Sequence, residues 1–192
     1  TRLLFAWSVE GGANQPQRER WSAVANILSY LDTDFLDHAD ELTFITGLAN
    51  FSGYNIVFKE KEAYVGRFIG GDEVFDYDRS GQCKGVRSAY SIITHNDFMA
   101  YYGSDKKFHQ WNLLQDTIIS EGIFPETKEF DPNTDAFVQG FDIARRNQFR
   151  WHCPSGDTTT HNYTVVYDYK QNIVQVWEYK EANSLSSIGA YN

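Results

Sequence analysis

The sequence predicts an α+β fold, in which antiparallel sheets are layered with helices. Short runs of branched and aromatic residues are paired around turn residues, as in β-hairpins. Other segments carry apolar residues at the spacing of an amphipathic helix. Because the two kinds of segment come in blocks, antiparallel sheets are favoured over a doubly wound parallel sheet.

The first half of the chain is expected to form a strand, two helices and a hairpin. Residues 2–9 are apolar and aromatic, and the run stops at Gly11-Gly12, which suits a strand and a turn. Residues 18–30 predict an amphipathic helix, whose stripe is Trp21, Val24, Ala25, Leu28 and Leu31. A second short helix is expected at 37–49. The two runs on either side of the KEKE turn, 53–60 and 62–70, predict a hairpin.

The second half is expected to form a strand, two helices and a closing hairpin, with no internal repeat. The strand is at 86–96, and the helices are at 106–122 and 136–149. The first of these helices places Trp111 at the centre of its apolar face, and Asp135 is positioned to cap the second. The hairpin occupies 161–180 and turns at residues 170–172.

Composition indicates one acidic domain, residues 1–192, with a sizeable core. The formal net charge of −9 leaves no basic stripe for nucleic acid or for an anionic membrane surface. We therefore expect no nucleic-acid partner, and partners that are neutral, apolar or cationic. No apolar run approaches the roughly 18 to 20 residues of a membrane span. A soluble protein, cytoplasmic or lumenal, is expected, with no cofactor and no metal.

The closing hairpin offers an alternative that would be catalytic. Asp168, Glu178 and Lys180 follow the order of the metal-dependent PD-(D/E)xK nucleases, in which two carboxylates hold a divalent cation. Alternate residues of a solvated strand show the same pattern, however, and the acidic chain offers no phosphate-binding surface. A plain hairpin is the preferred interpretation.

The two cysteines, Cys83 and Cys153, are too few for a disulfide framework, and their spacing leaves a single bridge open without implying it. His152, Cys153 and His161 are near one another in sequence but match no standard zinc spacing. A loop histidine and a small buried thiol are the simpler interpretation.

Three segments taken together resemble a known group of enzymes. They are SGYNIVFKEKEAYVGRF, then AYSIITHNDF followed by KKFHQWNLLQDTI, and finally HNYTVVYDYKQNIVQVWEYKE. In order and spacing they resemble the later part of N-terminal-nucleophile amidases of the choloylglycine hydrolase, acid ceramidase, isopenicillin-N acyltransferase-like and NRDE groups. The resemblance covers roughly residues 20 to 182. It implies an αββα fold, incomplete in this chain.

The resemblance also implies a site. The family uses an N-terminal cysteine as nucleophile and the amide of a Thr-Asn motif as oxyanion donor. Here the motif is Thr94-His95-Asn96, so that His95 stands where the family has its amide and Asn96 follows one place late. Asn55 of the GYN hairpin is a further candidate for contacts to the substrate. The chain begins with Thr1 on a strand that lies after the family's nucleophile.

The sequence therefore leads to a hydrolase or acyltransferase of C–N amide bonds, acting on a small acyl-amide substrate. Its nucleophile would be supplied by a second polypeptide segment, and the chain alone would be inactive. Asn96, Asn55 and His95 are the candidate catalytic residues. The alternative is a non-catalytic structural or binding protein, such as an assembly subunit, in which the strands only build the core.

Overall fold

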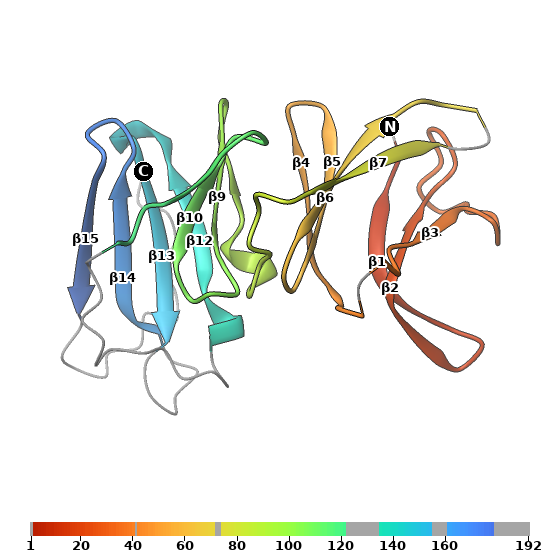
Figure 1. Ribbon diagram of the computed structural model, residues 1–192, viewed down its shortest axis with the longest axis horizontal. Coiled ribbons are helices and arrows are strands. Elements are labelled where there is room, and N and C mark those ends of the chain that lie inside the picture. The colour runs from red at the N-terminus through yellow and green to blue at the C-terminus, as the bar shows by residue number, and fades with distance from the viewer. Residues whose placement is uncertain (1, 41, 72–73, 122–134, 155–160, 179–192) are drawn as a thin grey trace.

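The chain is built almost entirely of antiparallel β-strands (Figure 1). The structure, a computed structural model, describes residues 2–40, 42–71, 74–121, 135–154 and 161–178. Within these ranges there is no α-helix, and the helical segments are the 3₁₀ turns η1 (Ala89–Ser91), η2 (Asp135–Phe137) and η3 (Ala144–Arg146). The predicted α+β class and its αββα layering are therefore wrong. No helix in the described ranges has the length and hydrophobicity needed to cross a membrane.

Four sheets follow one another along the chain, and each is a simple meander. The first contains β1 (Leu4–Glu10), β2 (Ala13–Trp21) and β3 (Phe35–Asp37). The second contains β4 (Ile45–Phe51), β5 (Tyr54–Lys59), β6 (Ala63–Phe68) and β7 (Phe75–Ser80). The third contains β8 (Ile93–Thr94), β9 (Met99–Tyr102), β10 (Phe108–Trp111) and β11 (Asp116–Ile118). The fourth contains β12 (Gln139–Ile143), β13 (Gln148–Pro154), β14 (His161–Asp168) and β15 (Ile173–Glu178).

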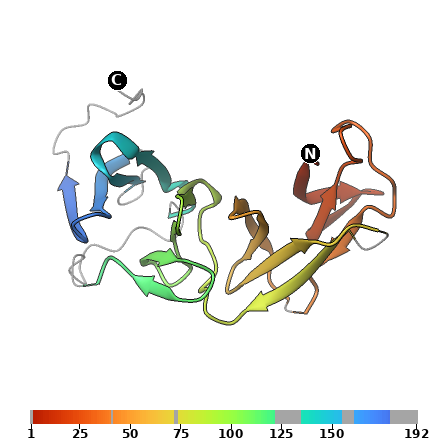
Figure 2. The ribbon, with the colours of Figure 1, turned by 90° about the horizontal axis from the view of Figure 1, so that it is seen from above.

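The sheets are arranged side by side along a curve, as the view from above shows (Figure 2). The first strand of each sheet contacts the first strand of the next, in the order β1, β4, β8 and β12. Successive meander sheets arranged radially around their first strands are the blades of a β-propeller. The described chain thus resembles a run of four propeller blades, with the first and fourth at opposite ends (Figure 1).

The core is divided into layers that lie between neighbouring sheets. Ile45, Val57 and Tyr64 form the layer under the first sheet, against Ala6. Larger clusters fill the spaces between the second and third sheets and between the third and fourth. Trp111 is fully buried in the middle layer, so its prediction as a core residue is confirmed, although it lies on β10. Each sheet is therefore held mainly by its neighbours, as in other repeat architectures.

The four predicted helices, 18–30, 37–49, 106–122 and 136–149, are wrong for a common reason. Residues 18–21 end β2, where Trp21 pairs with Leu4 of β1, and the apolar positions after it lie in an exposed connection in which Leu28 is 87% exposed. The apolar spacing of 3 and 4 residues arose by chance across a strand end and a turn. Long-range strand pairing overrides such a local pattern.

The same reason applies further along the chain. Residues 106–122 contain β10 and β11 instead of a helix, joined by a turn at which Leu114 is 84% exposed. Residues 37–49 lead into β4, and residues 136–149 contain β12 between 3₁₀ turns. The strand predicted at 86–96 is confined to β8.

The sequence was more reliable for hairpins. Residues 2–9 lie largely in β1 and the turn follows at Gly11-Gly12, while β5 and β6 form the hairpin around the KEKE turn. The closing hairpin is β14 and β15, with its turn at residues 169–172. Turn residues and β-branched runs are adjacent in sequence, so local chemistry is enough to predict them.

Candidate functional site

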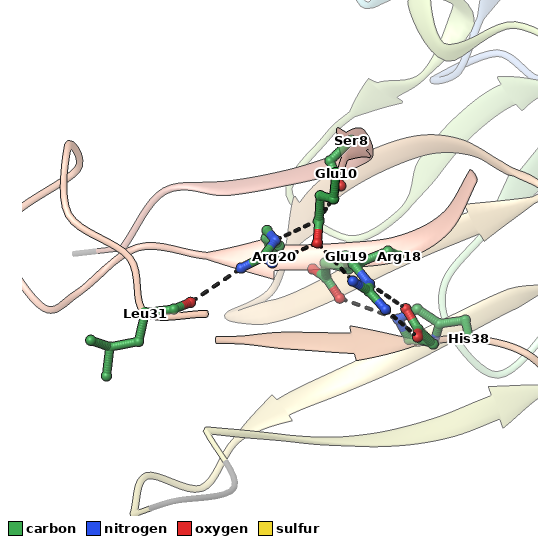
Figure 3. A network of polar contacts seen from close by, with 8 residues as sticks. Ser8, Glu10, Arg18, Glu19, Arg20, Leu31 and His38 are labelled. Atoms are coloured by element: carbon green, nitrogen blue, oxygen red, sulfur yellow. Dashed lines mark hydrogen bonds and ion pairs between the residues drawn. The ribbon is translucent and has the colours of Figure 1, made fainter. Parts of the chain in front are cut away.

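A fully buried carboxylate, Glu19, lies between the first and second sheets. Successive side chains of a strand point to opposite faces, so Glu19 of β2 faces the second sheet while Arg18 and Arg20 face away. Both arginines bind Glu10 instead, at 2.7 Å (Figure 3). Figure 3 shows Glu19 directed toward His38. The charge of Glu19 must therefore be stabilised from the second sheet and from His38.

The second sheet supplies hydrogen-bond donors from one row of paired residues. Asn55 of β5, Gly66 of β6 and Tyr77 of β7 are neighbours in register. Gly66 has no side chain, and a Cβ built there would lie 2.3 Å from the Tyr77 ring, so Tyr77 lies across this position. The Asn55 amide and the Tyr77 hydroxyl both donate hydrogen bonds to Glu19. Burial and the nearby Glu19 charge raise the pKa of Tyr77, which keeps the hydroxyl protonated as a donor.

His38 completes the network from the segment that follows β3. Its Nε2 lies 3.2 Å from Glu19 Oε2, and its ring is packed between Tyr64 and Tyr77, with ring centroids 4.8 Å away on each side. Its backbone carbonyl accepts a hydrogen bond from Lys59 Nζ at 2.6 Å. With the ring packed on two sides and hydrogen bonded at Nε2, its orientation is fixed.

A pocket of about 400 Å³ lies over this network. Its lining consists of Trp21, Thr33, Phe35, Leu36, Asp37, His38, Asp40, Tyr64, Val74, Phe75, Asp76 and Tyr77. Five of these are aromatic side chains besides the histidine, three are aspartates, and none is lysine or arginine. The pocket therefore combines apolar walls with acidic groups.

The three aspartates of the pocket differ in how their charges are neutralised. Asp37 accepts two hydrogen bonds of 2.7 Å from the Arg18 guanidinium. Asp76 lies 3.7 Å from Arg67, in an exposed and weaker ion pair. Asp40 is only 3.4 Å from the Tyr64 hydroxyl and has no ion pair within the described part of the chain. Asp40 is thus the acid whose charge is left uncompensated at the pocket.

The pocket wall also holds a donor without an acceptor. Trp21 is 6% exposed, and its Nε1 makes no hydrogen bond among residues whose positions are described. A buried donor of this kind costs free energy unless an acceptor reaches it. Because the nitrogen itself is buried, a ligand with an acceptor would satisfy it only if the Trp21 ring moved.

The arrangement lacks the parts of a nucleophilic enzyme. Glu19 and His38 resemble the acid and base of a catalytic triad, but no serine, threonine or cysteine of the described ranges is hydrogen bonded to His38. No group of three or more histidine, cysteine or acidic side chains is placed to hold a metal ion, again within the described ranges. In the part of the chain that the structure describes, no nucleophile is therefore assembled beside Glu19 and His38.

The candidate catalytic residues from the sequence are not brought together. Asn55 lies between the first and second sheets, where it binds Glu19. His95 belongs to the other end of the molecule, where its Nδ1 lies 3.4 Å from Asp142 and its ring packs on Tyr169 at 4.6 Å. Asn96 is exposed in the turn after β8. Asn55 is thus remote from His95 and Asn96, which are adjacent in sequence.

The proposed nuclease carboxylates are also apart. Asp168 pairs with Ile173 beside the turn of the closing hairpin, whereas Glu178 pairs with Tyr163 at its far end. Five residues of strand separate these positions, about 17 Å at the usual rise per residue. Asp168 instead accepts hydrogen bonds from the backbone of the turn. Lys180 lies outside the described residues.

The cysteines are both free and buried, so the bridge left open by the sequence is absent. Burial raises the pKa of Cys83 to about 12 and holds that of Cys153 well above its ordinary value. His152 hydrogen bonds to Thr164 at 2.7 Å. These thiols are protonated at neutral pH and are poor nucleophiles.

A second hollow, of about 750 Å³, lies between the third and fourth sheets. It is lined by Gln110, Thr117, Ile118, Ile119, Glu121, Tyr167, Tyr169, Asn172, Ile173 and Val174. Tyr167 and Gln110 hydrogen bond to each other there at 2.9 Å. The hollow is wider and has a single acidic residue, so it offers fewer groups that would orient a ligand.

Sequence reasoning found Asn55 but missed Glu19, His38 and Tyr77. One signal was available in the stretch QRERW, residues 17–21. In a strand, this stretch places Gln17, Glu19 and Trp21 on one face and the two arginines on the other. A glutamate on the same strand face as a tryptophan indicates a polar group within an apolar layer, and this pattern pointed to Glu19.

No protein-family model matches this chain, and no curated protein matches it either. The interpretation of function therefore depends on the pocket and its chemistry.

Proposed function

We propose that the chain is a non-catalytic binding module, whose pocket between the first and second sheets receives a group presented by a ligand or a partner. The observation that carries this proposal is a pocket with aromatic walls over a fully buried polar network, in which no described serine, threonine or cysteine is hydrogen bonded to His38. Concave sites with mostly apolar walls and a few oriented polar groups are the usual form of small-molecule sites.

The network supports the proposal by keeping the pocket formed before a ligand arrives. Glu19 is held by donors from Asn55 and Tyr77, and His38 is packed between two rings. Side chains fixed in this way lose little entropy on binding.

The amide hydrolase hypothesis is not carried further. The resemblance implied an αββα fold, whereas the described residues form four meander sheets. Of its site residues, Asn55 also lies in a different part of the molecule from His95 and Asn96. A binding module needs neither the missing helices nor an external nucleophile.

The proposal is tested by a small-molecule screen of the ¹⁵N-labelled chain, observed on the indole N–H signals of its five tryptophans. The library contains neutral, anionic and cationic fragments and simple sugars. Some fragments should shift the signal of Trp21, which lines the pocket, and leave that of the buried Trp111 unchanged.

A matched pair of variants serves as the control. Leu36→Trp places a larger side chain in the pocket lining, at the position opposite Glu19 in the strand register, whereas Leu114→Trp places it on an exposed turn of the third sheet. Binding should be lost in the first and kept in the second. If no fragment of any class shifts Trp21, or if Leu36→Trp binds as well as the parent chain, this pocket is not the functional site.

A further inference from the structure

We infer that the pocket between the first and second sheets selects an organic cation, namely an alkylammonium group attached to a hydrogen-bond acceptor. This inference rests on the proposed function and adds the chemistry of the ligand. It follows from the ring systems, the charge and the unpartnered donor of the pocket.

The walls provide the first argument. Trp21, Phe75 and Tyr77 are packed edge-on or tilted to one another, with centroid distances of 5.5 Å and 6.0 Å, and Tyr64 and Phe35 complete the lining. The rings therefore surround the pocket from several directions. An alkylammonium group is attracted to aromatic faces, and a quaternary one such as that of choline also has an apolar outer surface, so it suits walls of this kind.

The charge balance provides the second argument. Arg18 neutralises Asp37, and Arg67 partly neutralises Asp76, but Asp40 has no ion pair in the described ranges. The lining itself holds no lysine or arginine. Arg18 lies 3.7 Å from the centre of the Phe35 ring and Lys59 lies 5.8 Å from that of Tyr64, but each is paired with a carboxylate, Asp37 and Glu62 respectively. An anion would meet uncompensated negative charge, and the net charge of the chain, −9, would oppose its approach.

The unpartnered indole provides the third argument. Trp21 Nε1 is buried and lacks an acceptor within the described residues. Because the indole nitrogen is itself buried, a ligand satisfies it only if the Trp21 ring turns toward the pocket, and that ligand then carries a hydroxyl, carbonyl or carboxylate oxygen close to its cationic group. Choline has this combination. A lysine residue within a polypeptide also carries a cation and carbonyl oxygens, but four methylene groups separate its ammonium from the backbone, so the shared chemistry is the organic cation.

The test compares choline with its neutral carbon isostere, 3,3-dimethylbutan-1-ol, by titrating the ¹⁵N-labelled full chain and following the Trp21 indole signal. The two molecules have nearly the same shape and the same hydroxyl, and differ in charge. Choline should bind about tenfold more tightly, the size of a cation–π contribution in a partly desolvated site. Glucose tests a neutral polyol in the same assay.

Two variants test the role of Asp40. Asp40→Asn should weaken choline about fivefold and leave the isostere unchanged, because it removes a charge near the solvent. Asp97→Asn makes the same change in an exposed turn of the third sheet and should alter neither affinity. N-acetyl-lysine methylamide, compared with its norleucine analogue, distinguishes a polypeptide side chain from a free amine as the natural source.

The outcomes separate the inference from the proposed function. If the isostere or glucose shifts Trp21 as strongly as choline does, the pocket binds ligands but the inference of a cation is overturned. Equal affinities of choline for Asp40→Asn and Asp97→Asn would also overturn it. If none of these molecules and no fragment of the screen shifts Trp21, both fail.

Discussion

His109 should make the stability of this chain depend on pH, although it lies far from the pocket. Its Nε2 lies 2.8 Å from Asp105 and its Nδ1 lies 3.1 Å from Asp116, and its ring stacks on Tyr101. Only the imidazolium form can donate to both carboxylates. Burial alone would lower the pKa of His109, but the bonds to Asp105 and Asp116 outweigh it and raise the pKa to about 9.

The sign of the effect follows from this raised pKa. In the unfolded chain His109 titrates near its ordinary value of 6.5. The stabilisation is therefore complete below pH 6.5 and is lost as pH rises through about 9. One pKa unit corresponds to about 1.4 kcal/mol, so the loss across this window should be about 2 to 3 kcal/mol.

The assay is urea denaturation of the parent chain and of Asp105→Asn at several pH values between 6 and 9. The substitution replaces a half-exposed carboxylate with a neutral acceptor, so the ring nitrogen keeps a hydrogen-bond partner but loses a charge. The difference in unfolding free energy between the two chains should shrink as pH rises. Comparing the chains cancels the titration of Cys83, which also affects stability at high pH. A pH-independent difference would refute this account of His109.

Other predictions concern packing, the buried network and metal binding. Tyr77→Phe should lower the unfolding free energy by about 2 kcal/mol because it removes a donor from a buried carboxylate, whereas Tyr90→Phe, at an exposed tyrosine, should change it by less than about 0.5 kcal/mol. Trp111→Ala should cost about 3 to 5 kcal/mol in the same denaturation assay, and a loss below about 1 kcal/mol would contradict its placement in the core. Magnesium or manganese should leave the melting temperature unchanged, because Asp168 and Glu178 lie at opposite ends of their hairpin, and a shift abolished by Glu178→Ala would contradict this.

Hairpins were predictable from the sequence, whereas the architecture was not. The turns after Glu10 and Lys59 connect strands that are adjacent in sequence, so their residues carry the information. The helices were predicted from periodic apolar residues, for example around Leu28 and Leu114, which lie in exposed connections. Pairing with neighbouring strands determined the structure of those segments. Where strands are short, apolar residues of a strand end and of the turn after it can fall at helical spacing by chance.

The sequence did not reveal that four similar sheets follow one another, because the sheets share an arrangement of strands but no sequence motif. In each of the last three sheets, a buried second strand pairs with the third, at residues 54–59 and 63–68, 99–102 and 108–111, and 148–154 and 161–168. The turns differ in length and the apolar residues differ in size, so no fixed spacing recurs in the sequence. The shared feature is that each sheet buries a face against its neighbour.

The candidate site was predictable only in part, because its residues come from distant positions. Asn55 and Tyr77 are 36 and 58 residues from Glu19. Asn55 was identified for an oxyanion role implied by a family resemblance, yet it stabilises a buried carboxylate instead. Gly66 has no side chain, and this leaves space for Tyr77 to reach Glu19. The relation between the two residues can be recognised only when the strand register is known.

The most direct test of the central claim is an intermolecular nuclear Overhauser experiment on the chain with choline. The nine methyl protons of the ammonium group give one intense signal, and their contacts report which rings surround it. Contacts are expected with the rings of Trp21, Tyr64 and Tyr77, which line the pocket between the first and second sheets. Contacts with the rings of the other hollow, such as Tyr169, or no contacts at saturating choline, would contradict the claim.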